Sequence, residues 1–103
     1  LKNLVKLMEE NVADADFNIE KMAKMMFFSR SHFIRKVKIL TGQKPLELLV
    51  SYRLKMAKQL LGQKEISISE VAYSVGYDNP SSFTRAFKAK FNQSPSAFID
   101  SLT

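Results

Sequence analysis

The chain has 103 residues and no Cys, and its 16 Lys and Arg exceed its 10 Asp and Glu, giving a formal net charge of +6. This length suffices for one domain, and an apolar content of 46% argues against disorder. The absence of Cys excludes a disulfide scaffold and every thiolate metal site. Polar residues interrupt the apolar runs, so we expect no membrane contact by this domain.

The positive charge is unevenly distributed along the chain. Residues 1–20 hold two Lys against five Asp and Glu, a net charge of −3, whereas the remaining residues hold 14 basic against 5 acidic side chains, a net charge of +9. A basic body of this kind is typical of proteins that bind polyanions. Basic domains without a nucleic-acid ligand are common, so charge alone does not identify the ligand.

Apolar residues recur at helical spacing from the start of the chain, and no segment alternates as a strand does. The first predicted helix has an apolar face made of Leu1, Leu4, Val5, Met8 and Val12. Asn18 has the side chain of a helix cap and predicts the start of a second helix. The inner face of that helix consists of Ile19, Met22, Ala23 and Met26.

A third helix is expected from about Ser29 to Gly42, because glycine suits the left-handed residue that ends a helix. Its inward side chains should be Phe33, Val37 and Leu40. Pro45 suits the first position of a fourth helix, which should reach about Leu61. Apolar residues cover so much of this helix that we expect it to be largely buried between two halves. They are Leu46, Leu49, Val50, Leu54, Ala57, Leu60 and Leu61.

The second half follows a short polar connection at residues 63–65, which is no flexible linker. Ser67 and Glu70 have the spacing of a capping box for a fifth helix that ends at Gly76. Asn79 and Pro80 predict the start of a sixth helix. The inward residues of these two helices are Ile68, Val71, Ala72, Val75, Phe83, Phe87 and Phe91. A last short helix from Ser94 and Pro95 has the apolar residues Phe98 and Leu102.

The second half repeats the first. Ile19, Ala23, Phe33, Arg35, Lys38 and Pro45 recur as Ile68, Ala72, Phe83, Arg85, Lys88 and Pro95, at an offset of 49 that becomes 50 after one inserted residue. Each copy has a short helix, a tight turn and a second helix with basic residues, which is the order of a helix-turn-helix motif. We predict one all-α domain, residues 1–103, with about seven helices. Its motifs should span about 19–42 and 68–92, joined by a long helix at about 45–61.

Residues Ile68–Pro95, ISEVAYSVGYDNPSSFTRAFKAKFNQSP, resemble the DNA-binding domain of the AraC/XylS family of bacterial transcription regulators. They follow that family's Ile-x-x-x-Ala helix, Gly-aromatic turn, Phe-x-Arg-x-Phe-Lys segment and closing Ser-Pro almost residue for residue. Residues 29–45, SRSHFIRKVKILTGQKP, with Arg53, Leu54 and Ala57, look most like the version at the C-terminus of hybrid two-component regulators.

The resemblance covers nearly the whole chain and implies the output domain of a bacterial transcription regulator that binds specific sequences of duplex DNA. It also implies a cytoplasmic location, an N-terminal sensor or ligand domain, and contact with RNA polymerase through the parent protein. A membrane anchor elsewhere in the parent protein is one option. Because the chain begins with Leu1 and not Met, we expect it to be a fragment of that protein.

Three positions depart from the family pattern. Asn92 replaces the usual Gly, Phe27 replaces the usual turn Gly of the first copy, and Ile99-Asp100 stands where the family often has an Arg. The first two changes concern backbone geometry and leave the DNA-binding inference intact. The third removes one potential phosphate contact near the C-terminus.

Helical spacing indicates which side chains face DNA. With Phe33 and Val37 in the core, one outward stripe of the third helix contains Ser31, Ile34, Arg35 and Lys38. The equivalent stripe of the sixth helix contains Ser81, Thr84, Arg85 and Lys88. The resemblance implies that these stripes enter successive segments of the major groove. The expected base-facing residues are Ser31, Ile34, Arg35, Ser81, Ser82, Thr84 and Arg85. The expected phosphate ligands are Arg30, Lys36, Lys38, Lys88 and Lys90.

Several of these residues have alternative interpretations. Arg35 and Arg85 are the first candidates for guanine contacts, because a guanidinium can bond O6 and N7 together. Both could instead be solvated or pair with nearby acidic residues. Ile34 either touches a thymine methyl group or covers the edge of the core. Lys36 and Lys90 need no ligand if they are ordinary surface residues. Two further interpretations are structural: His32 is solvated or near phosphate and not catalytic, and Phe27 and Phe28 form the turn and pack in the core.

The sequence offers no catalytic constellation. One His, no Cys and no Gly-rich phosphate loop leave no nucleophile-base pair and no metal site, so we expect no enzymatic activity, no metal and no cofactor. The main alternative to DNA binding is a protein-interaction module of antiparallel helices whose basic stripes bind acidic partners. Salt dependence and a preference for duplex DNA over other polyanions would separate the two.

Overall fold

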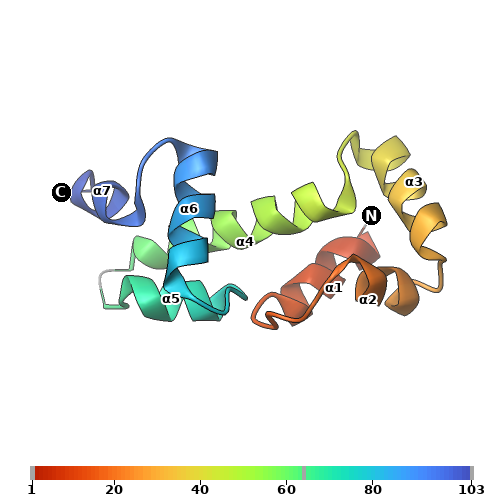
Figure 1. Cartoon of the computed structure of the whole chain (residues 1–103), viewed down its shortest axis with the longest axis horizontal. Coiled ribbons are helices and arrows are strands. Elements are labelled where there is room, and N and C mark those ends of the chain that lie inside the picture. The colour runs from red at the N-terminus through yellow and green to blue at the C-terminus, as the bar shows by residue number, and fades with distance from the viewer. Residues whose placement is uncertain (1, 64, 103) are drawn as a thin grey trace.

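The computed structural model describes residues 2–63 and 65–102 (Figure 1). Within these residues the fold consists of seven helices and no strand, which confirms the all-α prediction. The helices are α1 (Lys2–Asn11), α2 (Ile19–Met25), α3 (Arg30–Thr41), α4 (Pro45–Leu61), α5 (Ile68–Ser74), α6 (Pro80–Phe91) and α7 (Pro95–Asp100). Leu1, expected in the first helix, and Lys64, in the polar connection, lie outside the described residues.

The molecule is elongated along α4, with principal extents of 44 × 23 × 23 Å. The helices α1, α2 and α3 surround one end of α4, and α5, α6 and α7 surround the other (Figure 1). We call these groups, each with its adjoining half of α4, the first lobe and the second lobe. At ~1.5 Å per residue, the 17 residues of α4 span roughly 25 Å.

Each lobe has its own apolar core, and α4 contributes to both. Leu49 belongs to the core of the first lobe, whereas Leu54, Ala57 and Leu61 belong to the core of the second. The lobes therefore meet within α4. Because each core covers only one side of α4, the helix is less buried than predicted: Leu46 is 58% exposed.

The repeated helices of the two copies are capped at equivalent positions. Asn18 Oδ1 accepts the N–H of Lys21 at 2.9 Å at the start of α2, and Ser67 Oγ accepts the N–H of Glu70 at 3.1 Å at the start of α5. The longer helices end on left-handed residues, Gly42 with φ of +75° and Asn92 with φ of +60°. Asparagine tolerates this conformation better than most residues, so the chain reverses there without glycine.

Several apolar side chains predicted to pack in the core are exposed. Leu40 is 60% exposed, because it lies near the C-terminal end of α3 at the edge of an open apolar cavity. Phe27 forms the expected turn, with φ of +62°, but its side chain is 95% exposed. The adjacent Phe28 packs against the first core instead. Val5 and Leu102 are also exposed at the edges of their lobes.

Candidate nucleic-acid interface

The recognition helices predicted from the repeat, α3 and α6, lie at opposite ends of α4 (Figure 1). Each is anchored to its own lobe by two aromatic or branched side chains one turn apart. Phe33 and Val37 anchor α3, and Phe83 and Phe87 anchor α6; all four are buried. Anchoring one face of a helix in this way directs the opposite face toward solvent.

The predicted DNA-facing stripes have matching exposure in the two copies. Ser31, Arg35 and Lys38 are exposed on α3, as Ser81, Arg85 and Lys88 are on α6. Ile34 and Thr84, which are equivalent, are both half-buried, and so is Ser82. The side chains at the centre of each stripe are therefore partly supported by the protein, while the arginines extend from it.

Both recognition helices begin with a side-chain cap. Ser29 Oγ accepts the N–H of His32 at 3.2 Å, and Asn79 Oδ1 accepts the N–H of Ser82 at 2.8 Å. The His32 ring packs edge-on against Phe28, with ring centroids 4.9 Å apart, while His32 stays exposed to solvent. Arg30, a predicted phosphate ligand, is exposed in the first turn of α3.

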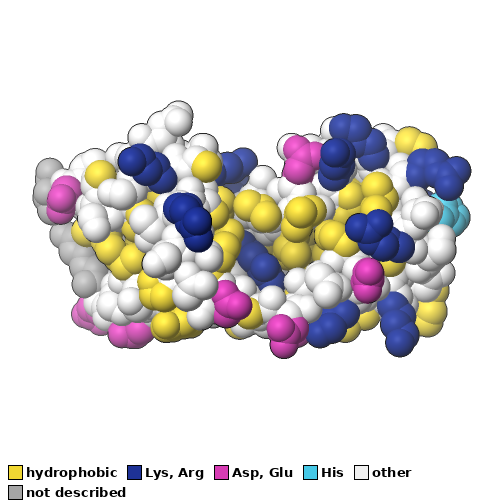
Figure 2. Space-filling view, viewed as in Figure 1, with side chains coloured by type: hydrophobic (Ala, Val, Ile, Leu, Met, Phe, Trp, Pro, Cys, Tyr) yellow, Lys and Arg dark blue, Asp and Glu magenta, His cyan; other side chains and the backbone are white. Residues whose placement is uncertain are grey.

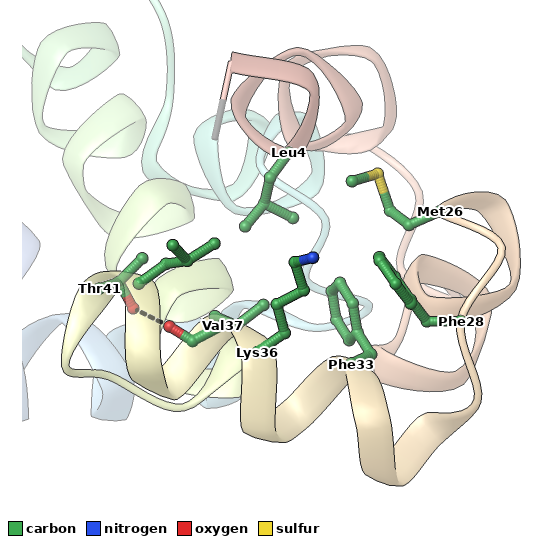
Figure 3. Close-up of a pocket in the computed structure, with 8 residues that line it drawn as sticks. Leu4, Met26, Phe28, Phe33, Lys36, Val37 and Thr41 are labelled. Carbon is green, nitrogen blue, oxygen red and sulfur yellow. Dashed lines mark hydrogen bonds between the residues drawn. The ribbon is translucent and has the colours of Figure 1, made fainter.

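Three predicted phosphate ligands, Lys36, Lys38 and Lys90, already interact with other parts of the protein. The Nζ atom of Lys36 lies 5.2 Å from the centroid of the Phe28 ring, and Figure 3 shows its side chain beside the apolar cavity lined by Leu4 and Met26. Lys38 Nζ donates to the carbonyl of Gly42 at 2.9 Å. A positive charge near the C-terminal end of α3 also interacts favourably with the helix dipole.

Lys90 points away from the stripe of α6. Its Nζ donates to Ser51 Oγ on α4 at 3.1 Å, so it joins α6 to the linking helix. Because Lys90 follows Lys88 by two residues, its side chain projects about 200° around the helix from it. Lys36 likewise lies off the stripe of α3, because it precedes Lys38 by two residues. Lys36 and Lys90 are thus less directly aligned with the arginines than Lys38 and Lys88 are.

Basic side chains are present on both lobes of the surface. Figure 2 shows Lys and Arg over both ends of the molecule, whereas several of the visible Asp and Glu side chains lie along its lower edge. None of the described residues forms a group of three His, Asp or Glu placed to bind a metal ion. Likewise, the described helices include none long and apolar enough to cross a membrane.

Two similar helix-turn-helix motifs on one shared helix define a bipartite DNA-binding domain. Residues 22–101 match the family model described as a helix-turn-helix domain. The chain belongs to this family of AraC-type DNA-binding domains found in transcription regulators, as the sequence predicts.

Three known proteins illustrate the relationship. Histidine kinase P4 of Formosa agariphila is 36% identical over 98 residues, which cover 95% of this chain and 7% of that protein. The HTH-type transcriptional regulator AlkR of Acinetobacter baylyi is 35% identical over 79 residues, 77% of this chain and 26% of that protein. The DNA-binding domain of the global transcriptional factor AdpA, solved with a target DNA, is 29% identical with a TM-score of 0.90, covering 97% of this chain and 89% of that domain. The chain spans about a quarter or less of the two curated relatives.

Proposed function

We propose that α3 and α6 enter successive segments of the major groove on one side of a DNA duplex and recognise two half-sites. The observation that carries this proposal is the matched exposure of equivalent residues on two helices held at opposite ends of α4. Equivalent major-groove segments repeat every ~34 Å along the duplex. A molecule 44 Å long, with a recognition helix in each lobe, has the dimensions to span that repeat.

Specificity comes chiefly from the two arginines in this proposal. Arg35 and Arg85 are exposed at equivalent positions, and each can make a bidentate contact with guanine. The neighbouring base-facing residues are Ser31, Ile34, Ser81, Ser82 and Thr84. Because Ile34 offers a methyl contact where Thr84 offers a hydroxyl, the two half-sites should differ in sequence.

Phosphate contacts position the domain on the duplex. Arg30 is exposed in the first turn of α3, and Lys38 and Lys88 are exposed within the two stripes; these three are the principal proposed ligands. Lys36, Lys38 and Lys90 become ligands by exchanging their contacts with Phe28, Gly42 and Ser51 for phosphate. Such exposed contacts contribute little stability, so the exchange is energetically accessible.

For the whole protein we propose a bacterial transcription regulator in which this chain is the output domain. An N-terminal sensor or ligand domain would control it, and the parent protein would contact RNA polymerase from the cytoplasm. The similarity to a much longer histidine kinase supports a hybrid two-component architecture, and the similarity to AlkR supports a role in transcription regulation.

Selection from random duplex DNA, followed by titration in increasing salt, tests this proposal. The logarithm of affinity should fall linearly with the logarithm of salt concentration, with a slope of about −0.9 for each phosphate neutralised. The selected sequence should contain two different half-sites in the same orientation about one helical turn apart. A slope near zero, or equal binding to heparin at physiological salt, would favour the protein-interaction alternative.

A further inference from the structure

Arg53 lies where the two lobes meet. Among the described residues of α4, it is the buried charged residue, with 9% of its surface exposed. It stands four residues after Leu49, which belongs to the first core, and four before Ala57, which belongs to the second. A charge on the buried side of a helix needs specific partners, because burial removes it from water.

The first partner of Arg53 comes from the loop between α1 and α2. Arg53 Nη2 donates to the backbone carbonyl of Asp14 at 2.8 Å, a bond that spans 39 residues of sequence. The same carbonyl accepts the N–H of Phe17 at 3.1 Å, so the loop has a fixed shape where the arginine holds it. Phe17 is buried in the first core, which ties this loop to the first lobe.

The second contact of Arg53 is with the turn between α5 and α6. A Cβ atom on Gly76 would lie 2.9 Å from both Nε and Cζ of Arg53, and 2.3 Å from the carbonyl oxygen of Val12. The guanidinium therefore lies directly against the Gly76 backbone, in a space that only glycine leaves open. Val12 itself is buried in the core of the second lobe, so the α1–α2 loop touches both lobes.

The electrostatic environment agrees with this geometry. Burial lowers the pKa of Arg53 from its ordinary value, while Tyr77 and Asp14 act in the opposite direction. Burial raises the pKa of the Tyr77 hydroxyl, and Arg53 opposes that increase. Nε of Arg53 is buried with no hydrogen-bond partner among the described residues. Since an unpaired buried donor is unfavourable, apolar packing and stability alone do not account for a charge at this position.

We propose that Arg53, the backbone carbonyls of Val12 and Asp14, and Gly76 form an interlobe clamp that fixes the angle between α3 and α6. Arg53 is then a positioning residue for DNA recognition: it touches no base, yet it determines which half-site spacing the domain accepts. Figure 1 shows the loop after α1 beside the turn that follows α5, where the clamp joins the lobes at a second point besides α4. The consequence for spacing relies on the proposed two-half-site function; the clamp itself does not.

The first measurement uses no DNA. Because the chain has no Cys, Glu20→Cys and Ser69→Cys introduce two unique spin-label sites at equivalent exposed positions of α2 and α5. In the 103-residue chain the interlobe distance distribution should be narrow, and Arg53→Met should broaden it. Lys55→Met removes the same charge from an exposed position of α4 and should leave the distribution narrow. An equally narrow distribution for Arg53→Met would overturn the clamp.

The second measurement uses the duplex selected by the unmodified chain, with its half-sites moved apart by single base pairs. Each added base pair shifts one half-site by ~3.4 Å and rotates it by about a tenth of a turn. Affinity of the unmodified chain should fall about tenfold or more over two base pairs, and that of Arg53→Met less than about threefold. Identical spacing profiles for the two chains would overturn the positioning role.

The two proposals fail in different ways. If the unmodified chain accepts every spacing equally, the two-half-site function is wrong, and the label distances alone decide whether the clamp exists. If Arg53→Met does not fold, as judged by circular dichroism, Arg53→Gln replaces it, because the shorter amide also loses the contact with Asp14 and Gly76. A narrow distribution and an unchanged spacing profile for Arg53→Gln would again overturn the clamp.

Discussion

Phe27 and Gly76 occupy the same position in the two helix-turn-helix motifs and share a left-handed backbone, with φ of +62° and +89°. The turn is built identically around them: Phe28 donates to the carbonyl of Ala23 at 2.9 Å, and Tyr77 to that of Ala72 at 3.0 Å. Their surroundings are opposite. The Phe27 side chain is 95% exposed, whereas any side chain at Gly76 would collide with Val12 and Arg53.

Replacing Phe27 with glycine should stabilise the domain. The left-handed conformation costs a side chain about 1–2 kcal/mol, and the greater freedom of glycine in the unfolded state removes part of that gain. Since the exposed Phe27 side chain has little packing to lose, Phe27→Gly should raise the free energy of unfolding by about 0.5–1 kcal/mol, measured by urea denaturation. Asn92→Gly is the control and should change stability less, because asparagine tolerates φ of +60°. A loss of stability in Phe27→Gly would show that the exposed ring makes a stabilising contact.

Gly76 and Gly42 provide a matched pair for the opposite change. Both have positive φ, but nothing lies within 4 Å of a Cβ at Gly42. Gly42→Ala should therefore lower the free energy of unfolding only by the cost of the left-handed conformation, about 1 kcal/mol. Gly76→Ala adds a collision with backbone and should lose about 2–4 kcal/mol in the same denaturation experiment. Equal losses would mean that the lobes separate enough to admit a methyl group at no cost.

Most of the helices could be predicted because their signals are local. Caps such as Asn18 and Ser67, and helix-ending residues such as Gly42 and Asn92, act on neighbouring backbone groups, so the sequence is sufficient to place them. The stripes containing Arg35 and Arg85 follow from helical spacing in the same way, and their DNA contacts stay predictions.

What the sequence could not supply is the tertiary environment of single side chains. Periodicity assigns Leu40 and Leu46 to inner faces, but each lobe is too small to cover the ends of its helices. The role of Arg53 depends on the distant residues Asp14 and Gly76. One local signal was present: Arg53 interrupts an apolar series at four-residue spacing between Leu49 and Ala57.

The stability lost when an α4 side chain is truncated to alanine should depend on how deeply that side chain is buried, and not on how hydrophobic it is. Leu54 is 1% exposed in the second core, so Leu54→Ala should lose about 2–5 kcal/mol of stability. Leu60 is half-buried against the same core and should lose less when it is replaced by alanine. Leu46→Ala, at a position 58% exposed, is the control and should change stability by no more than about 0.5 kcal/mol. Similar losses at Leu46 and Leu54 in chemical denaturation would contradict the two-core description of α4.

Substitution of the recognition arginines should affect one half-site each. If Arg35 and Arg85 contact guanine, Arg35→Ala and Arg85→Ala should each reduce binding of the selected duplex by about 1–3 kcal/mol and relax base preference only in the half-site read by that helix. Lys88→Ala, which removes a proposed phosphate ligand, should instead weaken binding to all sequences alike and reduce the salt slope by about 1. Binding of each variant to a panel of duplexes mutated in one half-site at a time distinguishes these outcomes. Selection of a palindrome bound by two copies through the same recognition helix would contradict the assignment, because Ser31, Ile34 and Arg35 would then read both half-sites.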